Sequence, residues 1–136
     1  MRSATDIVAA GLAGAAVSGV PSTAYSLVRG DDVLEGGRAV GTIVLPGETR
    51  TSVLLAAGAV VHFAISLGWA AVLATALPPE REPLTGVAAG LAIAALDLGL
   101  IGRRIPAIRA LPQGRQWADH AAYGLTVGLV LRARRC

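Results

Sequence analysis

Long apolar segments constrain the fold of this chain more than any other feature. The chain has 136 residues, and Ala, Gly, Leu, Val and Ile dominate four stretches of it, over residues 7–28, 52–77, 84–102 and 116–131. A helix needs about 20 mainly apolar residues to cross the hydrocarbon core of a bilayer. We therefore predict an all-α fold, an integral membrane four-helix bundle that forms a single transmembrane domain over residues 1–136.

The composition supports a lipid-facing surface. Charged residues make up 15% of the chain, against about 25% in an ordinary soluble domain. The net charge of +3 is small and spread over the connections, which argues against a nucleic-acid partner. The single cysteine, Cys136, excludes an internal disulfide and a thiolate metal cluster. The expected partners are the lipid bilayer and other membrane subunits or a second copy of the chain.

The first segment, residues 7–28, also has features of a secretory signal peptide. Arg2 precedes the apolar run, and small residues lie near Ser18, where a cleavage site would fall. The apolar run nevertheless continues to Val28, which favours a membrane span over cleavage.

The first connection contains a signal for the start of a helix. Asp32 followed by Glu35 fits a capping box, and one helical face would carry Val33, Gly37, Val40 and Val44. One interpretation is a short interfacial helix that ends at Pro46. The other is an ordinary loop, because the glycines of this stretch weaken a helix.

The remaining connections bear on topology. Residues 77–83 (LPPEREP) form a tight charged turn, so we predict that the second and third spans form an antiparallel hairpin. The side that carries the first and third connections holds Arg29, Arg38, Arg50, Arg103, Arg104, Arg109 and Arg115, and the other holds Arg2, Arg81, Arg132, Arg134 and Arg135. The larger number of arginines on the first side favours a cytoplasmic location for that side. Residues 116–131 are short and contain Asp119 and His120, and if they did not span, the terminal arginines would join the first side.

Small residues recur every four positions in each span. Residues four apart share one helix face, and the faces that carry His62 and His120 are also lined by small residues. Such faces are where helices approach each other in lipid. The predicted helix-packing glycines are Gly11, Gly19, Gly58, Gly86, Gly90, Gly124 and Gly128.

The polar residues of the spans concentrate in one half of the membrane. Counted from the helix ends on one side, His62 lies roughly 15 Å deep, Asp97 about 9 Å and His120 about 6 Å. The first span ends on the same side. The predicted intramembrane cluster consists of Ser22, Thr23, Tyr25, His62, Asp97, Asp119 and His120. We predict that His62 pairs with Asp97, and His120 is the alternative partner of Asp97.

This cluster has three interpretations. It can be a hydrogen-bonding network that fixes helix register, or a functional site for a proton or a small ligand, or for Asp/His acid–base chemistry. It can also be a haem site, but the depths of His62 and His120 differ by about 9 Å, which disfavours axial ligation by both. No catalytic residue, metal site or cofactor is predicted, and an enzyme is the less favoured class.

The order of motifs resembles a known group of proteins. A Gly/Ala-rich first span is followed by GAVVHFAISLGWAAVLATALP, by a glycine-spaced third span and by DHAAYGLTVGLVL. This order is similar to small four-span bacterial membrane proteins of unknown function and, distantly, to inner-membrane proteins of the YagU type. The chain lacks the longer polar termini of that type. The resemblance implies a multi-pass protein of the bacterial inner membrane and no established chemistry.

The sequence thus favours a small polytopic membrane protein with a structural or accessory role, such as a subunit of a membrane assembly. The alternative is a small transporter or a bundle that handles a ligand or protons through the His/Asp cluster.

Overall fold

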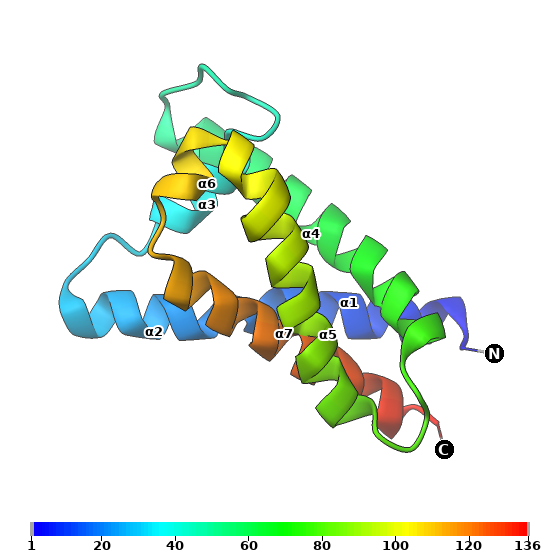
Figure 1. The fold of residues 1–136 in the computed structure, drawn as a ribbon. Helices are drawn as coiled ribbons and strands as arrows, with labels where there is room; N and C mark the ends of the chain where they lie inside the picture. Colours follow the sequence, from blue (N-terminus) through cyan, green and yellow to red (C-terminus); the bar gives the residue numbers. More distant parts are fainter. Residues whose placement is uncertain (1, 136) are drawn as a thin grey trace.

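The computed structural model describes residues 2–135, and this part of the chain is helical, without strands. Figure 1 shows the arrangement of its helices. The long ones are α1 (Ala4–Ser18) with α2 (Val20–Arg29), α4 (Thr51–Ala76), α5 (Glu82–Leu96) and α7 (Gln113–Ala133). The short ones are α3 (Glu35–Gly41), the π-helical η1 (Asp97–Ile101), the 3-10 helix η2 (Gly102–Arg104) and α6 (Pro106–Ala110).

The structure confirms an all-helical chain with three helices that are long and apolar enough to cross a membrane. These helices span Ala4–Arg29, Thr51–Ala76 and Glu82–Arg104. The fourth predicted span lies within α7, which is also a long helix but is not among those three. The four-span arrangement therefore stays a prediction.

The first helix is broken at Gly19. Pro21 lies in the first turn of α2, where the missing N–H of proline costs no helical hydrogen bond. The α1 and α2 segments remain nearly in line (Figure 1). Nothing lies within 4 Å of a Cβ built on Gly19, so its prediction as a helix-packing residue is wrong. Gly19 instead joins the two helices across the break that Pro21 imposes.

Helices α5 and α7 make the closest contact in the structure, through glycines on both sides. A Cβ on Gly86 would collide with the carbonyl oxygen of Gly124, and one on Gly90 with the carbonyl of His120. A Cβ on Gly128 would meet the carbonyl of Glu82. The two backbones are therefore in direct contact, as is typical of small-residue interfaces between membrane helices.

Helix α1 packs between α4 and α7. Gly11 faces Leu67 and Ala70 of α4, and Gly14 faces the ring of Tyr123 on α7. The hydrophobic core here consists of Ala10, Leu73, Ile93, Tyr123, Val127 and Leu131.

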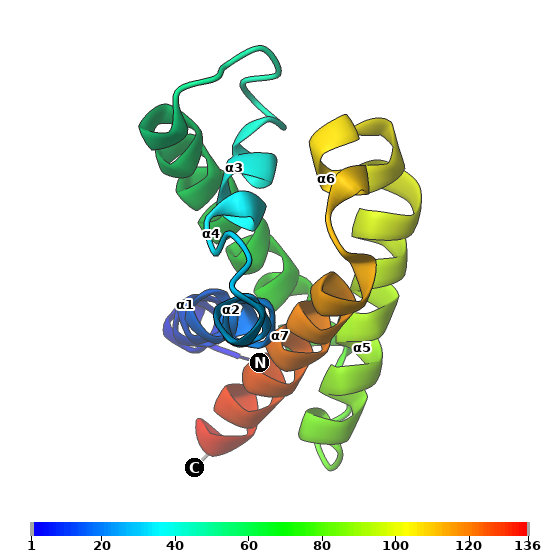
Figure 2. The ribbon, with the colours of Figure 1, turned by 90° about the vertical axis from the view of Figure 1, so that its left-hand side faces the viewer.

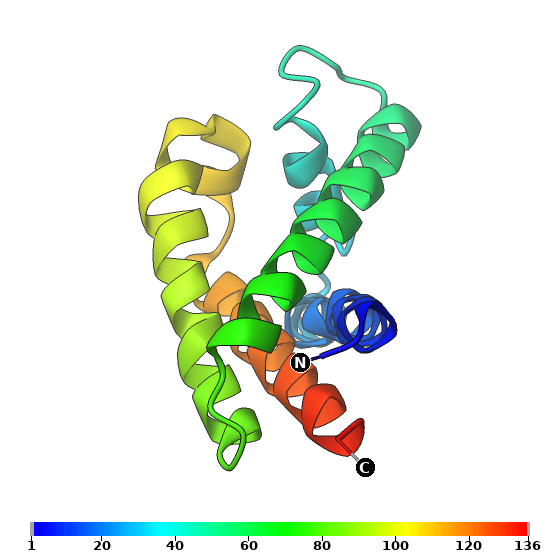
Figure 3. The ribbon, with the colours of Figure 1, turned by 90° about the vertical axis from the view of Figure 1, so that its right-hand side faces the viewer.

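The predicted hairpin of α4 and α5 is not formed. The helices are joined by a short turn but diverge from it (Figure 3) and scarcely touch within residues 2–135. Each packs on another helix instead, α5 on α7 and α4 on α1 and α3. The glycine contacts explain why α5 packs on α7, because they let α5 approach α7 more closely than it approaches α4.

The first connection does contain a short helix, α3, which packs on the first half of α4. A Cβ on Gly58 would collide with the carbonyl of Gly37. The predicted capping box is absent: Leu34 is the N-cap residue of α3, and Asp32 accepts a hydrogen bond from the Leu34 N–H at 2.8 Å. The carboxylate of Asp32 thus supports the turn before the helix rather than its first residues.

Ion pairs close the end of the bundle where the chain termini lie (Figure 1). Glu82, at the start of α5, is 1% exposed and pairs with Arg2 and, at 2.9 Å, with Arg135. Asp6 pairs with Arg134 at 3.4 Å. The bundle therefore has a closed end here, and its helices diverge toward the opposite end.

Candidate functional site

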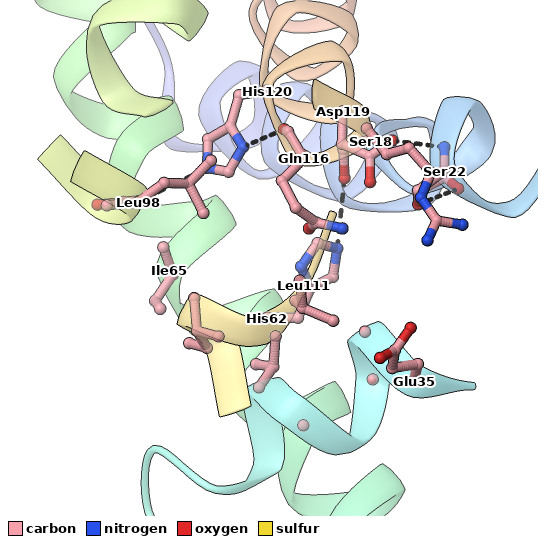
Figure 4. Close-up of a pocket in the computed structure, with 18 of the residues that line it drawn as sticks. Ser18, Ser22, Glu35, His62, Ile65, Leu98, Leu111, Gln116, Asp119 and His120 are labelled. Carbon is pink, nitrogen blue, oxygen red and sulfur yellow. Dashed lines mark hydrogen bonds and ion pairs between the residues drawn. The ribbon is translucent and has the colours of Figure 1, made fainter. Parts of the chain in front are cut away.

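A cavity of about 510 Å³ lies between the diverging helices. Figure 2 shows α3 and α4 on one side of this region and α5 and α6 on the other, above α2 and α7. The polar cluster predicted from the sequence lines the cavity, with the exception of Tyr25. Figure 4 shows part of this lining.

The cavity has a polar floor and apolar walls. The polar floor, contributed by α1, α2 and α7, consists of Ser18, Ser22, Thr23, Gln116, Asp119 and His120. One apolar wall consists of Val40 on α3, Ile43 just after α3 and Leu55 on α4. The other, from η1 to the residue after α6, consists of Leu98, Ile101, Ile105, Ile108 and Leu111. A molecule with one polar and one apolar end matches this division.

His62 faces α1, and its predicted pairing with Asp97 is wrong. Its Nε2 lies 2.9 Å from the Ala15 carbonyl and 3.4 Å from Ser18 Oγ. A carbonyl only accepts hydrogen bonds, so Nε2 carries the proton, and Nδ1 has no partner within residues 2–135. Because α4 packs on α1 and diverges from α5, the side chain that was expected to cross to Asp97 meets the α1 backbone instead.

Asp97 faces a different histidine. Its Oδ2 atom lies 3.7 Å from Nε2 of His120 and accepts a hydrogen bond from the Trp69 indole at 3.3 Å. Nδ1 of His120 lies 2.8 Å from the Gln116 carbonyl and must donate to it. The Nε2 atom therefore carries a proton, and can form an ion pair with Asp97 at this distance, only when the imidazole is doubly protonated. The ion pair between His120 and Asp97 therefore depends on the protonation of the imidazole.

The position of Asp97 depends on an irregular turn. Asp97 begins the π-helical segment η1, in which the Gly102 N–H bonds to the Asp97 carbonyl. Such π-helical turns insert one residue into a helix and occur often at functional sites. The turn carries the chain from α5 into the wall formed by η1 and α6.

Asp119 caps α2 from a different helix. Its Oδ1 accepts a hydrogen bond from the Ser22 N–H at 2.8 Å, a group left without a helical partner by the break at Gly19. A carboxylate at a helix N-terminus is also favoured by the helix dipole. Asp119 is 9% exposed, and its hydrogen bond from the Ser22 N–H uses only the Oδ1 atom.

Arg115 is the one guanidinium in the cavity lining. It donates to Ser26 Oγ at 2.7 Å, pairs with Asp31 at 3.2 Å and stacks over the Tyr25 ring at 4.9 Å. Tyr25 is 47% exposed and faces away from the cavity, so it does not belong to the cluster predicted from the sequence.

Two carboxylates from the first connection also line the cavity. Asp32 is paired with Arg38, and the hydrogen bond from that guanidinium holds the pKa of Asp32 below its ordinary value. Glu35, in the first turn of α3 (Figure 4), has no ion-pair partner in the described part of the chain. Asp32 is therefore neutralised by a neighbour, whereas Glu35 is not.

Sequence reasoning missed several lining residues. Arg115 was assigned to the third connection and Gln116 only to the first position of the span 116–131, but the structure places both in the first turn of α7. Pro112, directly before that helix, was the available signal, since proline often precedes or begins a helix. Glu35 was noted only as part of a capping box, and it lines the cavity because α3 packs on α4.

The described residues contain no group of three or more His, Cys, Asp or Glu side chains arranged to hold a metal ion. No family model matches the chain, and neither a curated protein nor a solved structure does. The geometry of the cavity therefore carries the functional argument.

Proposed function

We propose that this chain is a four-span protein of the bacterial inner membrane that binds a small molecule within its bundle. The single observation that carries the proposal is the cavity of about 510 Å³ with a polar floor and apolar walls. Sites for small ligands in proteins have volumes of about 300–1,000 Å³ and are mainly apolar, with a few polar groups that orient the ligand. Transport or sensing of that molecule would both use the same site.

The charged groups support this proposal over a purely structural network. Ionisable residues inside membrane proteins are rare and face the bundle interior or a water-filled cavity. Here Asp97, Asp119, His62 and His120 all line one cavity. A network that only fixed helix register would not need space between its members.

An accessory role in a membrane assembly is the second candidate function. It is favoured by the exposed apolar side chains on every long helix, among them Val8, Val60, Leu84 and Leu129. In a four-span protein these residues face lipid or a neighbouring subunit. The resemblance to proteins of the YagU type stays a prediction alongside it.

A cavity-filling substitution tests ligand binding. Ala59 lines the cavity, while Ala64 lies on the same helix and does not. The thermal stability of purified wild type, Ala59→Trp and Ala64→Trp would be measured with a panel of neutral, cationic and anionic amphiphiles. We expect at least one compound to stabilise wild type and Ala64→Trp but not Ala59→Trp. A panel without any such compound would favour the accessory role.

A further inference from the structure

We propose that the ligand of the cavity is a hydrophobic organic cation that binds in exchange for a proton. The inference rests on the proposed function and specifies the chemical class of its ligand. It follows from the charges that line the cavity, from their partners and from the shape of the site.

The carboxylates of the cavity outnumber its permanent cations. Glu35, Asp97 and Asp119 remain after Asp32 is paired with Arg38, and Arg115 is already paired with Asp31. With neutral histidines these three carboxylates give the cavity a net negative charge, and two of them remain uncompensated when His120 is doubly protonated. A cavity of one sign with low-dielectric walls attracts a ligand of the opposite sign.

The carboxylates have capacity left for a ligand. Asp119 is nine-tenths buried, yet only its Oδ1 atom accepts a hydrogen bond from the described residues. Glu35 has no ion pair, and it lies on α3 on the opposite side of the cavity from Asp119 (Figure 4). A cation between the two helices would be close to both carboxylates.

The apolar walls restrict the cation to a hydrophobic one. The aliphatic side chains of α3, α4, η1 and α6 surround most of the cavity. A metal ion or a small hydrated ammonium would leave these walls without a partner, because neither can exclude water from apolar surface. An organic cation with aryl or alkyl groups fills the walls and places its charge at the polar floor.

The pair of His120 and Asp97 supplies the exchanged proton. The pair is stable when His120 is doubly protonated, and it then neutralises Asp97. The charge of a cation bound in the same cavity disfavours the doubly protonated form of His120, so cation binding releases its second proton. The other charged or titratable groups that face the cavity are His62 on α4, Arg115, Asp119 and Tyr123 on α7, and Asp32 and Glu35 in the first connection. Protonation of the carboxylates among these groups also weakens cation binding. It therefore lowers the affinity at low pH, as protonation of His120 does.

Tetraphenylphosphonium and tetraphenylborate test the sign of the ligand, since they share one shape and carry opposite charges. Trp69 lines the cavity and reports binding by its fluorescence, with Trp117→Phe removing the second indole. We expect the cation to bind at least tenfold more tightly than the anion and its affinity to rise from pH 5 to pH 8. Equal binding of both ions, or tighter binding of the anion, would overturn the cation proposal and leave the small-molecule site intact. If neither ion binds, the cation proposal is contradicted. The amphiphile panel then shows whether the cavity binds a small molecule of another kind.

Charge-removing variants locate the bound cation. Asp119→Asn and Glu35→Gln should each weaken tetraphenylphosphonium binding about tenfold, while Glu80→Gln removes the same charge in the α4–α5 turn, away from the cavity. We expect Glu80→Gln to bind as wild type does. A loss of the same size in Glu80→Gln would show that the cation responds to net charge alone, and the assignment to the cavity would be wrong.

Discussion

The Nε2 atom of His120 lies 3.7 Å from the Oδ2 atom of Asp97, while His62 bonds to the Ala15 carbonyl at 2.9 Å. The histidine that faces the Asp97 carboxylate therefore lies on α7 and not on α4. This choice of partner sets the chemistry of the cavity, because His120 uses its other nitrogen to hold the Gln116 carbonyl.

Double-mutant cycles should distinguish the two histidines. Asp97→Asn keeps an acceptor for the Trp69 indole but removes the charge, and we combine it with His120→Gln or His62→Gln. The Asp97 and His120 cycle should show a coupling energy of about 0.5–3 kcal/mol, whereas Asp97 and His62 should add within about 0.5 kcal/mol. Reversible unfolding in one detergent mixture measures both. Coupling with His62 and none with His120 would contradict the observed pairing.

The glycine contact between α5 and α7 should tolerate no side chain. Gly124→Ala places a Cβ against the carbonyl of Gly86 and should lower the free energy of unfolding by about 1–3 kcal/mol. Gly68→Ala is the matched control, since nothing lies within 4 Å of its Cβ and alanine is the better helix former. Equal effects of the two substitutions would show that α5 and α7 do not touch at Gly124.

Asp119 should stabilise the start of α2 as a hydrogen-bond acceptor. Asp119→Ala leaves the Ser22 N–H without its partner, which costs about 1–3 kcal/mol. Asp119→Asn retains a side-chain carbonyl and should recover part of that loss. Glu80→Ala, in the exposed α4–α5 turn, should have little effect. If alanine and asparagine at position 119 destabilise equally, the capping hydrogen bond does not contribute.

The four-span proposal makes a prediction for the sidedness of single cysteines in a Cys136→Ser background. Gly47 and Arg109 lie in exposed positions of the first and third connections, and cysteines there should react with an impermeant reagent from the same side. Cysteines at Glu80 and Arg132 should react from the opposite side. A cysteine at Arg132 that reacts together with Arg109 would show that α7 does not cross.

The α3–α4 connection should show an unusually acidic carboxyl group. Hydrogen bonds from the Arg50 side chain, and then from backbone N–H groups, lower the pKa of Glu48 from 4.5 to about 2. A lowered pKa means that ionised Glu48 favours the folded loop above pH 4.5 and loses this effect as the pH falls through about 2. Arg50→Ala should move the pKa back toward 4.5 in a carboxyl NMR titration. Asp32, whose partner is Arg38, should keep its lowered pKa in that variant.

The positions of the helices could be predicted from the sequence. The predicted spans 52–77 and 84–102 correspond to Thr51–Ala76 and Glu82–Arg104. The length of an apolar segment and the residues that start or end a helix are local properties of the sequence. They can therefore be recognised without knowing which helices pack together. The spacing of the glycines also showed which faces can approach another backbone, but it did not show which neighbour each face would meet.

Only the tertiary structure decided those neighbours. Helix periodicity places His62 on a packing face, but the choice between α1 and α5 depends on all the contacts that compete for that face. The backbone contact of Gly86 with Gly124 commits α5 to α7, and this separates α5 from α4. The cavity results from that separation, and its polar floor depends on Asp119 reaching the helix break that Pro21 creates. These are contacts between residues far apart in the chain, so no local pattern in the sequence contains them.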